Sequence, residues 1–254
     1  MFIQSKNILI ILFIATSIQF LSGCYIDARL STARTNPLSV KKLDLNRMRL
    51  TSIPDEVFKC KNLETLILFR NYLTELPDEL FELEQLKKVV LDDNEITHLP
   101  EAIGKWKNLE FLSIKDNQLD SLPDQIGNLE KLKTLKLDYN YLTKLPNTIG
   151  NLKNLEWITL IENELYSLPP SFGQLHKLEF LEIGKNYLQA LPSSLGNLQN
   201  LVQLDLSFSG VLMQVPDELC NIRALETVYY DQTVLIPYCW QSVGRTNFRL
   251  VLVR

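Results

Sequence analysis

The chain has 254 residues, of which 46% are hydrophobic and 22% charged, and its formal net charge at pH 7 is −4. A chain of this length can bury a sizeable core, and one elongated domain is enough to account for it. The excess of acidic residues argues against a nucleic-acid partner, because proteins that bind nucleic acids normally present a basic face.

The first segment has the pattern of a processing signal. Lys6 supplies a positive charge, residues 8–20 form an uncharged apolar run, and the tetrapeptide LSGC ends at Cys24. This tetrapeptide resembles the lipobox of bacterial lipoproteins, which implies that residues 1–23 are a signal peptide and that Cys24 is lipidated. Its acyl chains would anchor the protein to a membrane. The alternative is an uncleaved transmembrane helix, because no charge occurs from residue 7 to residue 26.

Residues 24–38 are polar and show no repeat period, so we predict a lipidated N-terminus and a tether. In the resembled lipoproteins, an aspartate directly after the lipidated cysteine favours retention in the inner membrane. Here that residue is Tyr25. The resemblance therefore implies an outer-membrane lipoprotein of the bacterial cell envelope.

Between Val40 and Pro237 the chain repeats one segment, which reads LKTLKLDYNYLTKLP at residues 132–146. Its prolines recur every 23 residues (77 minus 54), with a single step of 24 before Pro216 (216 minus 192). A fixed period with LxxLxLxxNxL inside it indicates a solenoid of stacked coils. Asparagines recur at the same step, at Asn71, Asn94, Asn117, Asn140, Asn163 and Asn186.

The chemistry of one coil explains why it must repeat. Leu135 and Leu137 lie on the same face of a short strand, and a single coil has nothing against which to bury them. Successive coils therefore stack, with parallel strands about 4.8 Å apart. The asparagine amide both donates and accepts, so we predict that it satisfies backbone groups within and between coils. In LPxxIG we expect the proline to begin a helical turn and Gly150 to end it.

This pattern resembles the leucine-rich repeat family, in particular bacterial leucine-rich repeat lipoproteins with 23-residue repeats. The resemblance implies an α/β solenoid. It would be a right-handed superhelix with a parallel β-sheet on the concave face and short helical or 3-10 segments on the convex face. We predict a leucine-rich repeat domain over residues 39–254, with about nine to ten coils and a C-terminal cap over about 217–254.

The terminal coils depart from the pattern. Met48 takes the asparagine position of the first coil, and Cys60 takes a core leucine position, where we expect a buried thiol rather than a reactive one. Ser209 and Thr233 take the last two asparagine positions. Near the end, Phe248, Val251 and Val253 repeat the strand spacing and predict a tenth strand.

Cys220 and Cys239 lie in neighbouring coils on the side away from the strands, so they could form a disulfide in an exported protein. The alternative is two separate thiols.

Aromatic residues gather at strand positions that face the concave side. Exposed aromatics lower solubility unless a partner covers them, and aromatics commonly anchor binding surfaces. The alternative is that they stack along the sheet and stabilise it. The predicted partner-binding residues are Phe111, Tyr139, Trp157, Ile161, Phe180 and Phe208.

The sequence contains no recognisable group of catalytic residues. His98 and His176 lie three coils apart, and no phosphate-binding loop, zinc motif or nucleophile motif occurs. Asp92, Asp93, Asp116 and Asp138 could form a calcium site, but a solvated surface is the simpler interpretation. We therefore predict no catalytic residues, no metal and no cofactor.

The sequence thus favours a lipid-anchored, non-enzymatic envelope protein whose concave face binds a protein partner, with a possible adhesion or host-interaction role at the cell surface. The alternative is a periplasm-facing structural scaffold that organises other envelope proteins.

Overall fold

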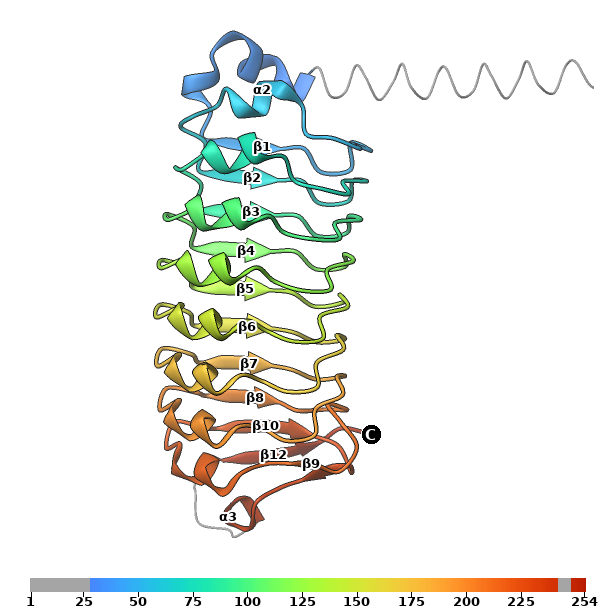
Figure 1. Cartoon of the computed structure of the whole chain (residues 1–254), viewed down its shortest axis with the longest axis vertical. Helices are drawn as coiled ribbons and strands as arrows, with labels where there is room; N and C mark the ends of the chain where they lie inside the picture. The colour runs from blue at the N-terminus through green and yellow to red at the C-terminus, as the bar shows by residue number, and fades with distance from the viewer. Residues whose placement is uncertain (1–27, 242–247) are drawn as a thin grey trace, which may run out of the picture.

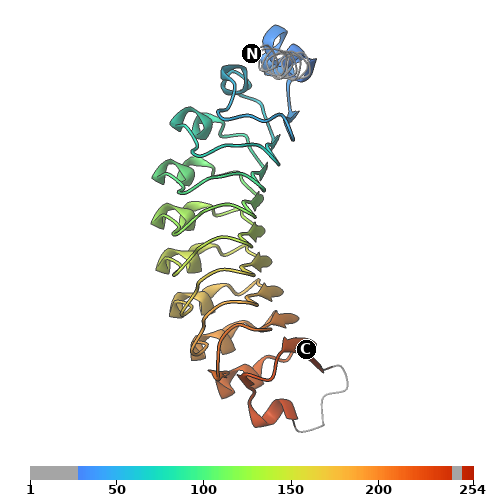
Figure 2. The same cartoon turned by 90° about the vertical axis from the view of Figure 1, so that its right-hand side faces the viewer.

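The computed structural model describes residues 28–241 and 248–254, which form a stack of coils (Figure 1). Within this part, ten short strands make one parallel sheet in which each strand pairs with its neighbours in chain order. The strands lie on the inner side of a gentle curve and the short helices on the outer side (Figure 2). The predicted α/β solenoid is confirmed. The strands are β1 (Lys42–Asp44), β2 (Thr65–Ile67), β3 (Lys88–Val90), β4 (Phe111–Ser113), β5 (Thr134–Lys136), β6 (Trp157–Thr159), β7 (Phe180–Glu182), β8 (Gln203–Asp205), β10 (Thr227–Tyr230) and β12 (Arg249–Leu252).

Most of the convex segments are 3-10 helices that begin directly after a proline. Pro146, for example, has the extended angles φ −68° and ψ 150° and caps the helix rather than starting it. The convex and terminal helices are η1 (Pro37–Ser39), α2 (Asp55–Phe58), η2 (Asp78–Glu82), η3 (Glu101–Lys105), η4 (Asp124–Asn128), η5 (Asn147–Asn151), η6 (Pro170–Gln174), η7 (Ser193–Asn197), η8 (Asp217–Asn221) and α3 (Tyr238–Gln241).

The glycine of each central coil does not end the helical turn, contrary to the prediction. Gly150 lies inside η5, which continues to Asn151, and no glycine in the described part has a positive φ. A Cβ atom on Gly150 would lie 2.3 Å from the backbone carbonyl oxygen of Ser171 in the next coil. Glycine is therefore needed because adjacent 3-10 helices approach too closely for a side chain.

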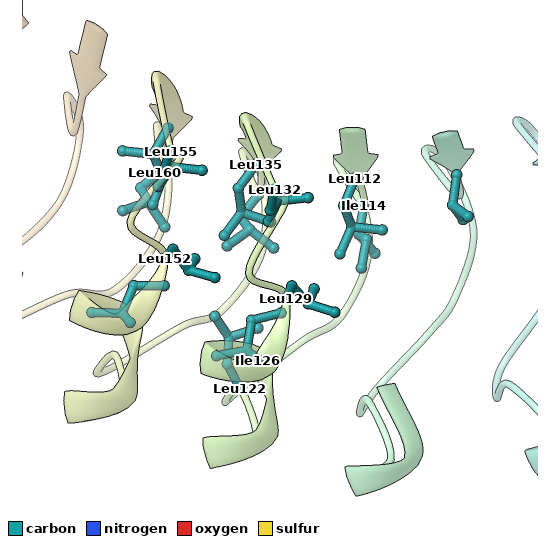
Figure 3. Close-up of a cluster of buried hydrophobic side chains, with 14 of the residues drawn as sticks. Leu112, Ile114, Leu122, Ile126, Leu129, Leu132, Leu135, Leu152, Leu155 and Leu160 are labelled. Atoms are coloured by element: carbon teal, nitrogen blue, oxygen red, sulfur yellow. The ribbon is translucent and has the colours of Figure 1, made fainter. Parts of the chain in front are cut away.

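A continuous apolar core fills the space between the sheet and the convex helices. Strand leucines such as Leu112 and Leu135 point inward and meet Ile126 and Leu129 from the convex side (Figure 3). All four side chains are fully buried. Because truncating a buried leucine to alanine typically costs about 2–5 kcal/mol, this shared core is the main stabilising feature of the stack.

The recurring asparagines bind backbone groups of two coils. The side-chain nitrogen of Asn140 donates to the carbonyl oxygens of Ile114 (2.9 Å) and Leu137 (3.0 Å). Its side-chain oxygen accepts the backbone N–H of Leu119 at 3.0 Å. Asn140 is buried, and without it the carbonyl oxygen of Ile114 and the N–H of Leu119 would lack a partner, whereas the carbonyl oxygen of Leu137 also accepts from Asn163 at 3.0 Å.

The N-terminal end corrects the predicted tether. Residues 28–35 form a helical segment whose Leu30 and Ala33 are fully buried against the first coil. Arg29 donates to the carbonyl oxygen of Asp44 at 2.6 Å. The sequence of this segment lacks the repeat period because it covers the end of the core instead of adding a coil. The predicted signal peptide and Cys24 lie outside the described residues.

The C-terminal end contains a disulfide between Cys220 of η8 and Cys239 of α3, with Cα atoms 6.1 Å apart. A small parallel pair is formed by β9 (Met213–Gln214) and β11 (Val234–Leu235), each of which precedes one of the two cysteines in the sequence. The tenth strand is present, but its register is shifted by one residue from the predicted one. Leu250, not Val251, pairs with Val228.

No helix in the described part of the chain is long and apolar enough to cross a membrane. The alternative of an uncleaved membrane helix concerns residues that lie outside that part.

Candidate functional site

The first residue of each strand projects onto the concave face, and its neighbours along the sheet are the equivalent residues of adjacent coils. In this row Phe111 pairs with Thr134, which pairs with Trp157, which pairs with Phe180. The predicted aromatic patch is therefore interrupted once, by Thr134. Trp157 and Phe180 are direct neighbours, with ring centroids 5.4 Å apart and planes inclined by 45°.

Lysines lie over the aromatic rings on this face. The ammonium nitrogen of Lys136 is 4.3 Å from the ring centroid of Trp157, and that of Lys88 is 4.6 Å from the ring of Phe111. Such cation–π contacts contribute about 0.5–1 kcal/mol each at exposed sites. They order the aromatic rings before any partner arrives.

Glu182 fixes the edge of the Trp157 ring, because the indole N–H donates to its side-chain oxygen at 3.3 Å. Burial raises the pKa of Glu182 above its ordinary value, and the nearby charge of Asp138 adds to that increase. The tryptophan is thus held by a carboxylate on one side and a lysine on another. We name Trp157, Phe180, Lys136 and Glu182 the central cluster.

The other predicted contact residues lie beside the sheet. Ile161 is half-buried just beyond β6, while Tyr139 and Phe208 are 42% and 45% exposed at the loop that follows the strands. Tyr139 and Phe208 both adopt the left-handed backbone region, with φ 57°. Phe208 and Lys185 help to line an open hollow of about 440 Å³ at this loop. The six predicted residues therefore form a broad surface rather than one compact patch.

The aspartates expected at the surface include one that is buried. Asp138 accepts the hydroxyl of Thr159 (2.8 Å) and the backbone N–H of Ile161 (2.9 Å), and it pairs with Lys115 at 3.3 Å. Its side chain is 5% exposed. The interpretation of Asp138 as a solvated residue is wrong, because its oxygens join two neighbouring coils.

A similar arrangement occurs two coils earlier. Asp92 accepts the hydroxyl of Ser113 (2.6 Å) and the backbone N–H of Lys115 (2.9 Å). Sequence reasoning missed both pairs, although a hydroxyl residue 21 positions after the aspartate in each case (113 minus 92, 159 minus 138) was a detectable signal. Among the residues that the structure describes, no three His, Cys, Asp or Glu side chains are placed to hold a metal ion.

Two family descriptions match the chain: "Leucine rich repeat" over residues 39–96 and "Leucine-rich repeat region" over residues 89–165. No curated protein matches it. These matches and the sheet geometry agree on a leucine-rich repeat fold.

Solved structures extend the comparison. The leucine-rich repeat ectodomain of the plant membrane receptor kinase GASSHO1/SCHENGEN3 from Arabidopsis thaliana, in complex with CASPARIAN STRIP INTEGRITY FACTOR 2, is 31% identical with a TM-score of 0.67. The plant peptide hormone receptor RGFR1 in complex with RGF2 is 28% identical with a TM-score of 0.65. Each covers 79% of this chain, which spans only 25% and 34% of the two receptor chains. A leucine-rich repeat protein of Leptospira interrogans is 26% identical, with a TM-score of 0.48, and covers 88% of this chain and 74% of its own.

Proposed function

We propose that this leucine-rich repeat solenoid is a non-enzymatic binding module that holds a protein or peptide partner on its concave sheet. The observation that carries the proposal is the central cluster, in which two large aromatic rings lie side by side and are already ordered by Lys136 and Glu182. Binding then costs little side-chain entropy, which is a general route to affinity. Aromatic anchors of this kind supply most of the energy at many protein interfaces.

The comparisons support this proposal at the level of the fold. The two plant receptors are solved in complex with CASPARIAN STRIP INTEGRITY FACTOR 2 and with RGF2, and they share their repeat architecture with this chain. The chain spans no more than about a third of either receptor, so the proposed location of the contact rests on the central cluster.

The lipid anchor and the envelope location belong to the proposal and rest on the sequence of residues 1–24. If Cys24 carries the lipid, the folded unit begins no more than four residues later, at residue 28 (28 minus 24). Four extended residues span at most about 14 Å. The proposal therefore places the N-terminal end of the solenoid close to the membrane, in contrast to a module on a long tether.

Display at the cell surface and a periplasm-facing scaffold give opposite results with protease added to intact cells. Loss of the full-length protein from intact cells supports adhesion or host interaction. Full protection until the outer membrane is opened supports the scaffold.

The contact surface is tested by replacing its anchors and measuring partner capture. Envelopes are cross-linked, and the partner is captured by Trp157→Ala, Phe180→Ala and the control Tyr166→Ala, an exposed aromatic away from the sheet. We expect at least about a tenfold loss of capture for the first two, as for interface hot spots, and none for the control. Circular dichroism confirms that each variant is folded. Unchanged capture by both cluster variants would reject the concave site.

A further inference from the structure

The first two coils contain a group of arginines that the proposed contact surface does not include. Arg47, Arg49 and Arg70 line an open hollow of about 460 Å³ together with Asn71, Tyr72 and Asp93. Arg70 pairs with Asp93 at 2.6 Å. Neither Arg47 nor Arg49 forms an ion pair with any residue in the described part of the chain, so the hollow carries two uncompensated positive charges.

The backbone holds Arg47 and Arg49 in place. The side-chain oxygen of Asn71 accepts the N–H groups of both Met48 and Leu50, each at 3.0 Å. Met48 is buried, while the arginines on either side of it are exposed and both have φ 56°. A positive φ directly before the asparagine position recurs in the following coils, for example at Arg70, but within the described residues a positive φ directly after this position, at Arg49, occurs only in the coil where Met48 replaces the asparagine. The two backbone turns present two guanidinium groups at this edge.

Phe69 lies against two of the three guanidinium groups. The guanidinium carbons of Arg47 and Arg70 lie 5.9 Å and 5.5 Å from the centroid of its ring. Two like charges against one ring repel each other, and an anion bound in this hollow would lower the repulsion. A guanidinium group is planar and can donate two parallel hydrogen bonds to the two oxygens of a carboxylate.

The charge at the loop edge reverses farther along the solenoid. The hollow beside Phe208 is lined by Glu162, Glu164 and Lys185, which sum to one negative charge. Asp92, just beyond the end of β3, lies between the arginines and the central coils. A long polyanion that followed the loop edge would be repelled beyond the first coils, whereas a short acidic stretch would not.

We propose that Arg47, Arg49 and Arg70 form an anion-binding subsite that accepts a short acidic segment of a protein partner through its carboxylates. The identity of the ligand as part of a protein rests on the proposed function, but the subsite itself does not. Phe111 lies three strands from β1, or about 14 Å at the usual strand spacing. Arg47 also lies three residues beyond the end of β1, so the partner segment would place its acidic residues more than about four extended residues from the apolar residues that reach the aromatic rings.

The test uses defined probes and the side-chain Nε–H signals of the arginines in NMR spectra of the full chain. The probes are acetylated and amidated tetraglutamate, the matching tetraglutamine, and a sulfated heparin tetrasaccharide. We expect saturable shifts of the Arg47, Arg49 and Arg70 signals with tetraglutamate and none with tetraglutamine. Absence of these shifts would overturn the subsite, and tighter binding of the tetrasaccharide would overturn its assignment to an acidic protein segment.

Matched variants separate the subsite from a general effect of net charge. The double variant Arg47→Gln/Arg49→Gln should weaken tetraglutamate binding at least about tenfold, because each charge-assisted hydrogen bond is a strong contact. The double variant Lys144→Gln/Arg223→Gln changes the net charge equally at exposed positions elsewhere and should stay within about twofold of the parent. Equal losses in both would overturn the proposal. Trp157→Ala should bind tetraglutamate as well as the parent protein does. A failure of the proposed aromatic contact can therefore be distinguished from a failure of the arginine subsite.

Discussion

The central coils and the two ends of the solenoid solve the same problem by different means. A central coil packs between two coils of similar sequence. Its asparagine forms hydrogen bonds with buried backbone groups, and its glycine lies where its convex helix approaches the helix of the next coil. At the ends these residues change. Met48 and Ser209 replace the asparagine, and Phe58, Phe81 and Cys220 take the place of the glycine. The difference shows that asparagine and glycine serve the contact between coils rather than the coil itself.

The largest expected effect comes from removing a central asparagine. Asn140→Ala would leave the N–H of Leu119 and the carbonyl oxygen of Ile114 buried without their present partner. Each such group costs about 1–3 kcal/mol, so we expect a loss of about 4 kcal/mol in the free energy of unfolding, measured by urea denaturation with circular dichroism.

The matched variant at the C-terminal end is Ser209→Ala. Ser209 donates one hydrogen bond, to the carbonyl oxygen of Ile183 at 2.9 Å, and the expected loss is about 1 kcal/mol. If the two variants lost equal stability, the asparagine would owe its recurrence to something other than its contacts between coils.

The next effect concerns the close approach of the convex helices. In Gly150→Ala the new Cβ would meet the backbone carbonyl of Ser171 at 2.3 Å, so the coils must move apart. We expect a loss of about 2 kcal/mol in the free energy of unfolding, as for overpacked cores. Thermal unfolding followed by circular dichroism measures it.

Gly104 lies where the pattern changes from phenylalanine to glycine and provides the control. A Cβ there would meet the side-chain nitrogen of Asn128 at 3.0 Å and the Cβ of Gln125 at 3.1 Å. The amide of Asn128 can swing away, so Gly104→Ala should cost less than about 1 kcal/mol. A loss at Gly104 as large as that at Gly150 would show that the backbone contact is not the cause.

The repeat made most of the fold predictable, because 23-residue spacing fixes which side chains must be buried and which coils must touch. The errors lie where the period stops. Residues 28–35 carry no repeat, so the sequence predicts a tether there, whereas the structure shows a helical segment with Leu30 fully buried. The register of β12 also differs from the predicted one. Leu250 pairs with Val228, a separation of 22 residues (250 minus 228), whereas the 23-residue repeat predicts Val251.

The candidate site was predictable in position but not in detail. Alternation along the strand places Phe111, Trp157 and Phe180 on the concave face. The contact of Lys136 with Trp157 and the burial of Asp138 depend on side-chain directions across two coils, which the pattern of one coil does not determine.

The smallest expected effect compares two acidic residues, one central and one near the C-terminal end, as the pH changes. Burial, together with the charge of Asp138, raises the pKa of Glu182 above its ordinary value of 4.5. Ionised Glu182 therefore lowers stability at neutral pH, and this cost disappears as the pH falls through the raised pKa towards 4.5. Glu182→Gln should increase the free energy of unfolding at pH 7 by about 0.5 kcal/mol, with little increase at pH 4.5.

Asp231 should behave in the opposite way. Burial raises its pKa, but hydrogen bonds from the hydroxyl and N–H of Thr233 and from the N–H of Phe208 outweigh burial, so the pKa lies below the ordinary 3.8. Ionised Asp231 stabilises the fold above pH 3.8, and that stability is lost only as the pH falls through its lower folded pKa. Asp231→Asn should therefore cost about 1 kcal/mol at both pH 7 and pH 4.5. Urea denaturation at pH 7 and pH 4.5 measures both variants. If Glu182→Gln increased the free energy of unfolding equally at the two pH values, its effect would not come from titration of the Glu182 carboxyl group.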